Sequence, residues 1–227
     1  MPRARSKKQD DWQTAALYED GSGCLSLYSL SILSVILITG LITLLALNTP
    51  IATAAASNSD TTSLSPIFTR EVQYWANDII RWANASALDP NLAAVVMQIE
   101  SCGNPRAVSR SGATSLFQVM PFHFLTGENP YNPETNALRG LSYLARSIQT
   151  ANGDARLALA GYNGGIGVIS RYESSWHAET KRYVYYGLPI YEDARSGKTS
   201  SPMLEEWYRR YGAGLCRQAS QQLGLTP

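Results

Sequence analysis

One carboxylate, Glu100, ends the apolar run "LAAVVMQIE", and the next acidic side chain along the chain is Glu128. The spacing of apolar residues predicts a helix whose last turn carries Glu100 at the edge of the apolar face. Burial and the negative end of a helix dipole both favour the protonated form of a carboxyl group there. Such a group can act as a general acid near neutral pH, although most glutamates at helix ends are simply solvated.

The residues after Glu100 limit the mechanisms by which this side chain could cleave a glycosidic bond. Ordinary glycosidases use two carboxyl groups about 5 to 10 Å apart, one as acid and the other as nucleophile or base. The 27 residues from Ser101 to Gly127 contain neither Asp nor Glu. If Glu100 cleaves a glycosidic bond, either a distant carboxylate folds into the site or the substrate supplies the attacking group.

Four motifs in order give this part of the chain a resemblance to a known family. The segment "ESCGNPRAVSRSGATSLFQVMP" resembles the glutamate-serine and Gly-Leu-Met-Gln motifs of the family 1 lytic transglycosylases, whose catalytic domain is lysozyme-like. The segments "NPETNALRGLSYLARSI", "LAGYNGG" and "AETKRYV" resemble the family's remaining motifs and follow in its order. The resemblance covers roughly residues 67–187.

The resemblance implies a role for each matching residue. Glu100 matches the family's catalytic acid/base, and Tyr162 matches a tyrosine oriented toward that acid. Ser109 matches a serine near the N-acetylmuramoyl group, and Glu179 a cleft glutamate often linked to the stem peptide. The implied substrate-binding residues are Ser109, Gln118, Met120, Tyr162, Asn163 and Glu179.

Some of these positions also have purely structural interpretations. Tyr162 could be a core tyrosine with a hydrogen-bonded hydroxyl, and Gln118 could satisfy backbone groups of its loop. Glu179 could be a helix partner of Arg182. Two departures from the family pattern affect the loop: Ser115 replaces a Gly where a turn favours positive φ, and Phe117 replaces a Met and should enlarge an apolar groove wall.

The implied reaction cleaves the β-1,4 bond between N-acetylmuramic acid and N-acetylglucosamine in peptidoglycan. Glu100 would protonate the leaving oxygen and then deprotonate the sugar's own C6 hydroxyl, which closes on C1 to give a 1,6-anhydro product. Intramolecular attack has a large effective-molarity advantage, so one side-chain carboxylate can suffice. No cofactor or metal is implied, because His123 and His177 are isolated. The alternatives are a muramidase similar to goose-type lysozyme, which uses water, and a catalytically silent peptidoglycan-binding protein.

Helices should position these residues. Residue types that favour helix N-termini predict the starts of four helices, at Asp89–Pro90, Asn132–Pro133, Asp154 and Ser201–Pro202. Residues 109–124 suggest an irregular loop or small hairpin. The sequence thus predicts a mostly α (α+β, lysozyme-like) domain at residues 67–227. The positions expected to face its core are Val72, Trp75, Ile79, Trp82, Leu92, Val96, Ile99, Leu138, Leu141 and Leu144.

A membrane segment is predicted ahead of this domain. Residues 25–47 carry no charge and would span roughly 35 Å as a helix. The nearby Lys and Arg residues all precede the segment, which predicts a cytoplasmic tail at 1–24, a transmembrane anchor or uncleaved signal at 25–47 and a flexible linker at 48–66. The catalytic domain then lies on the extracytoplasmic side, and it is secreted if cleavage occurs near Ala54 to Ala56.

Export also bears on the cysteines. Cys102 and Cys216 could form a disulfide outside the cytoplasm, tying the C-terminal helix back beside Glu100; the alternative is two buried thiols. The formal net charge of +1 offers no basic field of the kind that binds nucleic acid. Exo or endo cleavage, oligomeric state and protein partners stay open.

Overall fold

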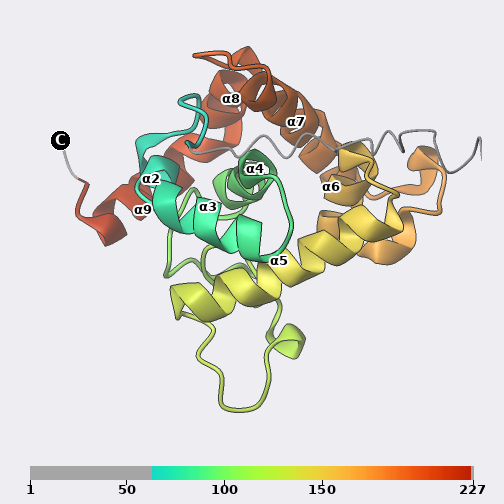
Figure 1. Cartoon of the computed structure of the whole chain (residues 1–227), viewed down its shortest axis with the longest axis horizontal. Helices are drawn as coiled ribbons and strands as arrows, with labels where there is room; N and C mark the ends of the chain where they lie inside the picture. Colours follow the sequence, from blue (N-terminus) through green and yellow to red (C-terminus); the bar gives the residue numbers. More distant parts are fainter. Residues whose placement is uncertain (1–62, 226–227) are drawn as a thin grey trace, which may run out of the picture. The chain divides into compact units, whose positions relative to one another are not determined.

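Helices account for nearly all regular structure in residues 63–225, the part of the chain that the computed structural model describes (Figure 1). The predicted membrane span at 25–47 lies outside these residues. No helix within 63–225 is long and apolar enough to cross a membrane. The helices are α2 (Arg70–Gln73), α3 (Ala76–Ala85), α4 (Pro90–Glu100), α5 (Pro133–Thr150), α6 (Ala155–Gly164), α7 (Ala178–Arg195), α8 (Pro202–Trp207) and α9 (Ala213–Leu223).

Helix α4 forms the centre of the domain and lies between α3 and α7 (Figure 1). Every residue from Pro90 to Gln98 is buried, as expected of a helix that is apolar around most of its circumference. Only its last two residues, Ile99 and Glu100, are half-buried. The most enclosed helix of the domain therefore brings Glu100 out at the boundary between core and solvent.

The predicted helix starts are confirmed. Asp89, Asn132, Asp154 and Ser201 each accept a hydrogen bond from a backbone N–H of the first turn, at 2.8 to 3.3 Å. Helix α6 ends at Gly164, and the following Gly165 has a φ of +87°. These caps fix where α4, α5, α6 and α8 begin.

Two details of the helices differ from the prediction. The apolar stripe in residues 70–85 is split between α2 and α3, because the chain turns at Tyr74 and Trp75. Leu138 was predicted to face the core, but 55% of its surface is exposed. The buried stripe of α5 instead runs through Ala137, Leu141 and Leu144, and Leu138 is rotated about 100° from it.

The loop after α4 has the predicted irregular form. Isolated antiparallel bridges join Val108 to Thr114 and Thr114 to Val119. Ser115 and Gln118 have positive φ values of +65° and +46°. The fold is thus mostly helical with very little strand.

Apart from a helical turn at Glu179 and Arg182, helix α7 was not predicted from the sequence. It runs for 18 residues with Pro189 inside it and contacts α4 and α6. The packed domain also begins slightly before residue 67, since Leu64 and Ser65 are buried and Ser65 N–H donates to Asn91 Oδ1 at 3.0 Å. After α8, a π-helical turn (Tyr208–Gly212) leads directly into α9.

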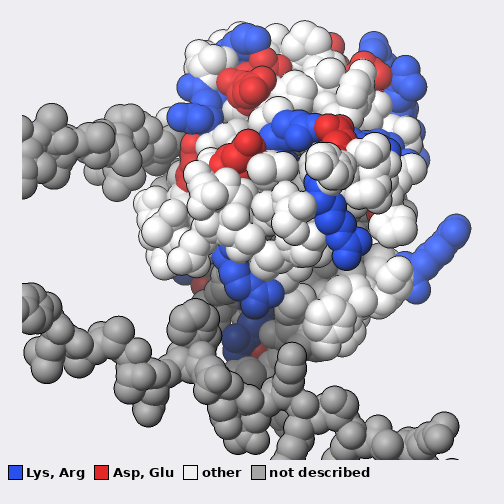
Figure 2. Space-filling view, turned by 90° about the vertical axis from the view of Figure 1, so that its right-hand side faces the viewer, with Lys and Arg blue, Asp and Glu red and all other residues white. Residues whose placement is uncertain are grey.

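Lys and Arg side chains are interspersed with Asp and Glu side chains on the face shown in Figure 2. Neither sign dominates that face, in agreement with the net charge of +1.

Phe117 occupies the core rather than the wall of a groove, so that expectation was wrong. Its side chain is fully buried, with its ring 6.3 Å from that of Trp82. It lies against Gly140 of α5, where an added Cβ would be 2.5 Å from the Phe117 Cβ. Helix α5 can approach the backbone of residue 117 this closely because residue 140 has no side chain.

Gly140→Ala is therefore expected to lower the free energy of unfolding by about 1 to 3 kcal/mol, because overpacking forces the backbone or Phe117 to shift. Denaturant titration followed by circular dichroism measures this change. Gly167→Ala is the matched control, since an added Cβ there meets nothing within 4 Å. If both variants are as stable as the wild type, the close packing of Phe117 on α5 is contradicted.

Candidate active site

A groove of about 450 Å³ passes over the end of α4 and is lined by Glu100. The loop after α4, helix α6 and the start of α7 contribute its other walls. All six side chains that the resemblance assigned to substrate line this groove: Ser109, Gln118, Met120, Tyr162, Asn163 and Glu179. Residues far apart in the sequence are therefore gathered around one carboxyl group.

The environment of Glu100 favours its protonated form. Burial raises the pKa of Glu100 to about 8, and the negative charge of Glu179 acts in the same direction. The hydroxyl of Tyr183 partly opposes the rise by favouring the carboxylate. Glu100 is thus mostly a carboxylic acid at neutral pH, as the sequence predicted.

Tyr183 is a site residue that the sequence reasoning did not single out. Its hydroxyl is buried beside Glu100 and has no partner at full hydrogen-bond geometry within residues 63–225. A small movement would let it donate to the Glu100 carboxylate. The signal was present in the motif "AETKRYV", whose tyrosine is Tyr183.

Tyr162 connects α6 to the loop after α4. Its hydroxyl donates to the backbone oxygen of Phe117 at 2.7 Å, and its ring lies 5.8 Å from that of Tyr143. Tyr162 is therefore both a tyrosine with a hydrogen-bonded hydroxyl, as its structural interpretation predicted, and a lining residue of the groove. Burial and the nearby Glu100 carboxylate raise its pKa well above the usual range, so it stays protonated.

Side chains of the loop hold its backbone in place. Gln118 Nε2 donates to the backbone oxygens of Ser115 and Ala107, at 2.9 and 3.3 Å. Ser115 adopts positive φ where the family has Gly, and its hydroxyl donates to the Pro105 oxygen at 2.9 Å. Ser109 Oγ accepts from the Ala113 N–H at 3.0 Å. These bonds present one wall of the groove in a defined shape.

Glu179 is a second carboxylate at the site. It lines the groove together with Glu100, and no ion pair with Arg182 occurs in the described part of the chain. Next to it, Thr180 Oγ1 donates to Asn163 Oδ1 at 2.9 Å and joins α7 to α6. Glu179 thus lies in the same groove as Glu100, and its presence there does not by itself decide between a second catalytic carboxylate and an attacking group from the substrate.

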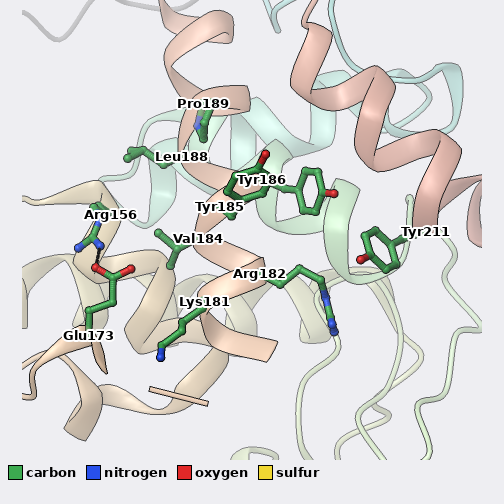
Figure 3. Close-up of a pocket in the computed structure, with 10 residues that line it drawn as sticks. All are labelled: Arg156, Glu173, Lys181, Arg182, Val184, Tyr185, Tyr186, Leu188, Pro189 and Tyr211. Atoms are coloured by element: carbon green, nitrogen blue, oxygen red, sulfur yellow. Dashed lines mark hydrogen bonds and ion pairs between the residues drawn. The ribbon is translucent and has the colours of Figure 1, made fainter. Parts of the chain in front are cut away.

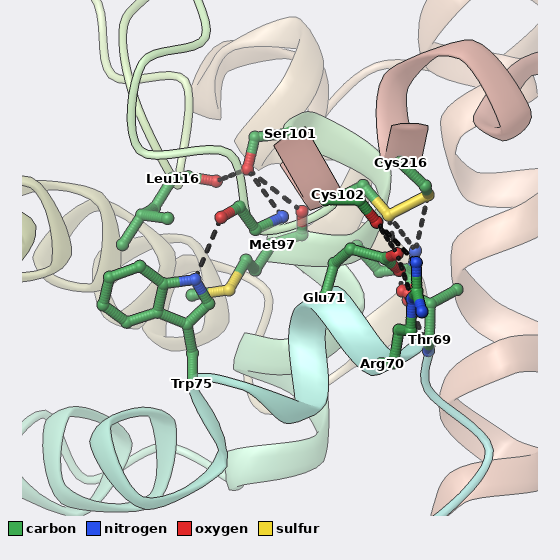
Figure 4. Close-up of a disulfide and its surroundings, with 12 residues drawn as sticks. Thr69, Arg70, Glu71, Trp75, Met97, Ser101, Cys102, Leu116 and Cys216 are labelled. Atoms are coloured by element: carbon green, nitrogen blue, oxygen red, sulfur yellow. Dashed lines mark hydrogen bonds and ion pairs between the residues drawn. A yellow bond between two sulfur atoms is a disulfide. The ribbon is translucent and has the colours of Figure 1, made fainter. Parts of the chain in front are cut away.

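A disulfide joins Cys102, two residues after Glu100, to Cys216 of α9 (Figure 4). Their Cα atoms are 5.0 Å apart, and both residues are buried. Glu71 lies beside the bond and accepts hydrogen bonds from Ser220 and Arg70. Within residues 63–225, Glu71 and these two cysteines are the one group close enough to share a metal ion, and the disulfide occupies both of its sulfur atoms.

Comparison with known proteins finds similarity between the part of the chain that holds this site and a described domain type. Residues 77–184 match the family model of the Transglycosylase SLT domain. A transglycosylase of Enterobacteria phage PRD1 is 38% identical over 115 residues, which are 49% of this chain and 40% of the phage protein. Membrane-bound lytic murein transglycosylase C of Edwardsiella ictaluri (strain 93-146) is 34% identical over 119 residues, 43% of this chain and 33% of that protein.

Among solved structures, an inactive mutant of the lytic transglycosylase Slt from Pseudomonas aeruginosa is similar, with 24% identity and a TM-score of 0.44. The alignment covers 55% of this chain and 24% of that chain. This chain therefore spans less than half the length of each of these relatives. The family match includes Glu100 and the groove residues but ends before α8 and α9.

Proposed function

We propose, from the match of residues 77–184 to the Transglycosylase SLT domain, that the protein is a peptidoglycan lytic transglycosylase with Glu100 as its single catalytic acid and base. The observation that carries the proposal is the half-buried Glu100, with a pKa of about 8, inside a groove lined by all six implied sugar-binding residues. The mostly helical domain with a short irregular β segment also supports a lysozyme-like fold.

The proposed reaction has two proton transfers through one carboxyl group. Glu100 first donates its proton to the oxygen that links C1 of N-acetylmuramic acid to C4 of N-acetylglucosamine. The C1–O bond breaks while the neighbouring N-acetyl oxygen supports the positive charge at C1. The Glu100 carboxylate then accepts the proton of the C6 hydroxyl, and O6 bonds to C1. No water is consumed, and Glu100 is protonated again.

Tyr183 can stabilise Glu100 during this reaction cycle. After the first transfer Glu100 is an anion in a largely buried position, which costs free energy unless a donor is close. The unpartnered hydroxyl of Tyr183 lies beside it and can donate to the carboxylate. Tyr183 would thus stabilise the charged intermediate form of Glu100.

Glu179 favours a second candidate function, a muramidase that hydrolyses the same bond. Its carboxylate lines the groove with Glu100 and could orient a water molecule. Mass spectrometry of digested peptidoglycan separates the two reactions. We expect 1,6-anhydro ends; free reducing ends would contradict the ring-closing reaction and support the hydrolase.

The pH dependence of cleavage tests the assignment of Glu100. Since the first step needs its protonated form, kcat/KM should fall as pH rises through about 8. Glu179→Gln removes a negative charge that raises this pKa, so the fall should move to lower pH. Tyr183→Phe removes a hydroxyl that lowers it, so the fall should move to higher pH.

The result specific to this assignment is that the alkaline fall of kcat/KM moves in opposite directions in Glu179→Gln and Tyr183→Phe. Profiles of kcat/KM against pH measure both shifts. Glu128→Gln is the control, because Glu128 pairs with Arg139 at 2.5 Å and does not line the groove. A profile that neither substitution moves would show that another group controls the alkaline side.

We also infer that the domain acts on the cell-wall side of a membrane, anchored through residues 25–47. The uncharged segment and the Lys and Arg residues before it support this topology. Protease added to intact spheroplasts should digest the domain, whereas protection of the domain would contradict the topology.

A further inference from the structure

Four aromatic rings lie in series along one wall of the catalytic groove. Their centres are 5.8 Å apart between Tyr162 and Tyr143, 4.8 Å apart between Tyr143 and His123, and 4.5 Å apart between His123 and Phe122. All four residues line the groove. The series starts at Tyr162, where burial and then the charge of Glu100 raise the pKa, and it ends at Phe122, which is 74% exposed. The rings therefore lead from the neighbourhood of the catalytic carboxyl group out to solvent.

A short turn holds the outer two rings in place. The chain forms a 3₁₀ turn that starts at Pro121. His123 N–H donates to the Met120 oxygen at 3.0 Å, and Phe124 N–H donates to the Pro121 oxygen at 3.2 Å. Phe124 then packs against the hydrophobic core, whereas Phe122 points its ring at solvent and at the ring of His123. A side chain fixed in this way loses little conformational freedom when a ligand covers it.

The chemistry of these rings suits an uncharged ligand. Burial, and then the positive charge of Arg146, lower the pKa of His123, so its imidazole is neutral near neutral pH. A neutral imidazole has one N–H donor and one nitrogen acceptor, and the rings of Phe122 and Tyr143 have apolar faces. A sugar ring matches both features, because it carries hydroxyl groups around its edge and C–H groups on its faces.

Exposed apolar side chains occur elsewhere on the domain, so exposure alone does not identify a site. Leu125, on the same loop as Phe122, is 64% exposed and does not line the groove. Figure 3 shows the half-exposed Tyr185 among the residues that line a separate cavity of about 620 Å³ along α7. Its ring packs on Tyr186 and belongs to no series that reaches the groove. Phe122 differs from both Leu125 and Tyr185 because it ends a row of rings inside the groove.

We propose that Phe122, His123 and Tyr143 form a platform that binds a sugar ring of the glycan strand further along than the two sugars joined by the cleaved bond. This inference rests on the proposed function, because it takes a glycan strand to lie in the groove at Glu100. The C–H face of the sugar covers the exposed ring of Phe122, and His123 forms a hydrogen bond with a sugar hydroxyl. The platform makes the protein favour long strands over short fragments, since only a long strand reaches both Glu100 and Phe122.

The test compares two substrates from the same peptidoglycan: long glycan strands and tetrasaccharide fragments. Phe122→Ala should lower kcat/KM about tenfold on the long strands and less than about twofold on the tetrasaccharide. Phe122→Tyr keeps an aromatic ring and should stay within about twofold of the wild type on both substrates. A loss in Phe122→Ala that is not larger on long strands would overturn the platform. A loss in Phe122→Tyr as large as that in Phe122→Ala would overturn it too, because stacking requires only the ring.

Leu125→Ala and Tyr185→Ala are the matched controls. Each removes an exposed apolar side chain, the first from the same loop and the second from the cavity along α7, and neither residue lines the groove. Neither variant should change the rate on either substrate. A loss limited to long strands in Leu125→Ala as well would overturn the specific role of Phe122. Because Phe122 is mostly exposed, its substitution should leave the thermal unfolding curve unchanged, which circular dichroism checks.

A binding measurement separates this inference from the proposed function. In a Glu100→Gln background, calorimetry with long glycan strands freed of their peptides by an amidase should give a Kd that Phe122→Ala raises about tenfold. An unchanged Kd would overturn the platform. A raised Kd in a protein whose wild type cleaves neither substrate would support the platform and overturn the proposed function alone.

Discussion

Glu100→Gln is expected to lower the kcat/KM for peptidoglycan cleavage by about 10³-fold or more. The amide has nearly the shape of the carboxylic acid but can neither donate the first proton nor accept the second. The groove and its other lining residues stay in place, so binding of glycan strands should persist. Release of soluble muropeptides, quantified by mass spectrometry, measures the loss.

The same substitution should stabilise the protein, which excludes unfolding as the cause of lost activity. The pKa of Glu100 is about 8 in the folded state against a usual 4.5, so the folded state binds a proton that the unfolded state has lost between these pH values. The presence of Glu100 therefore lowers stability as pH rises from 4.5 to 8. At pH 7 the gain in Glu100→Gln should be no more than about 3 kcal/mol, and it should shrink toward pH 4.

Two outcomes would contradict this account. Undiminished cleavage by Glu100→Gln would move the catalytic role to another group, with Glu179 the nearest carboxylate in the groove. A variant that is both inactive and less stable than the wild type would point to a structural role for Glu100. Glu128→Gln, which alters a carboxylate outside the groove, should change neither cleavage nor this pH-dependent difference in stability.

The parts of the fold that depend on local backbone chemistry could be predicted from the sequence. Asp89, Asn132 and Asp154 cap helices because each short side chain reaches an unpaired N–H of its own first turn. Positive φ at Ser115 was predictable because the matching family position is a Gly. The motif residues could be placed near Glu100 only through resemblance, since spacing alone does not bring α6 and α7 to the end of α4.

Features that depend on tertiary packing could not be predicted in this way. Phe117 is buried beside a helix that approaches its backbone closely because residue 140 is Gly. Most of helix α7 was missed because Pro189 and several tyrosines obscure its apolar period. Leu138 was placed inside because its type is apolar, although its neighbour Ala137 faces the core. The partnerless hydroxyl of Tyr183 is visible only once α7 is packed beside Glu100.

The disulfide gives the second large effect. Replacing both Cys102 and Cys216 by Ala should lower the free energy of unfolding by about 2 to 5 kcal/mol, because the bond closes a long loop and restricts the unfolded chain. The sequence separation of the two cysteines is 114 residues. Denaturant titration of the wild type and the double variant, with and without reductant, measures the difference.

Reductant should lower the stability of the wild type to that of the double variant and leave the double variant unchanged. Peptidoglycan cleavage should fall with it, because the bond ties α9 to Cys102, two residues after Glu100. Noncovalent contacts also hold α9, among them the hydrogen bond from Ser220 to the buried Glu71. If the double variant matches the oxidised wild type in both stability and activity, these contacts alone hold α9 in place, and the end of α4 that carries Glu100 needs no covalent support.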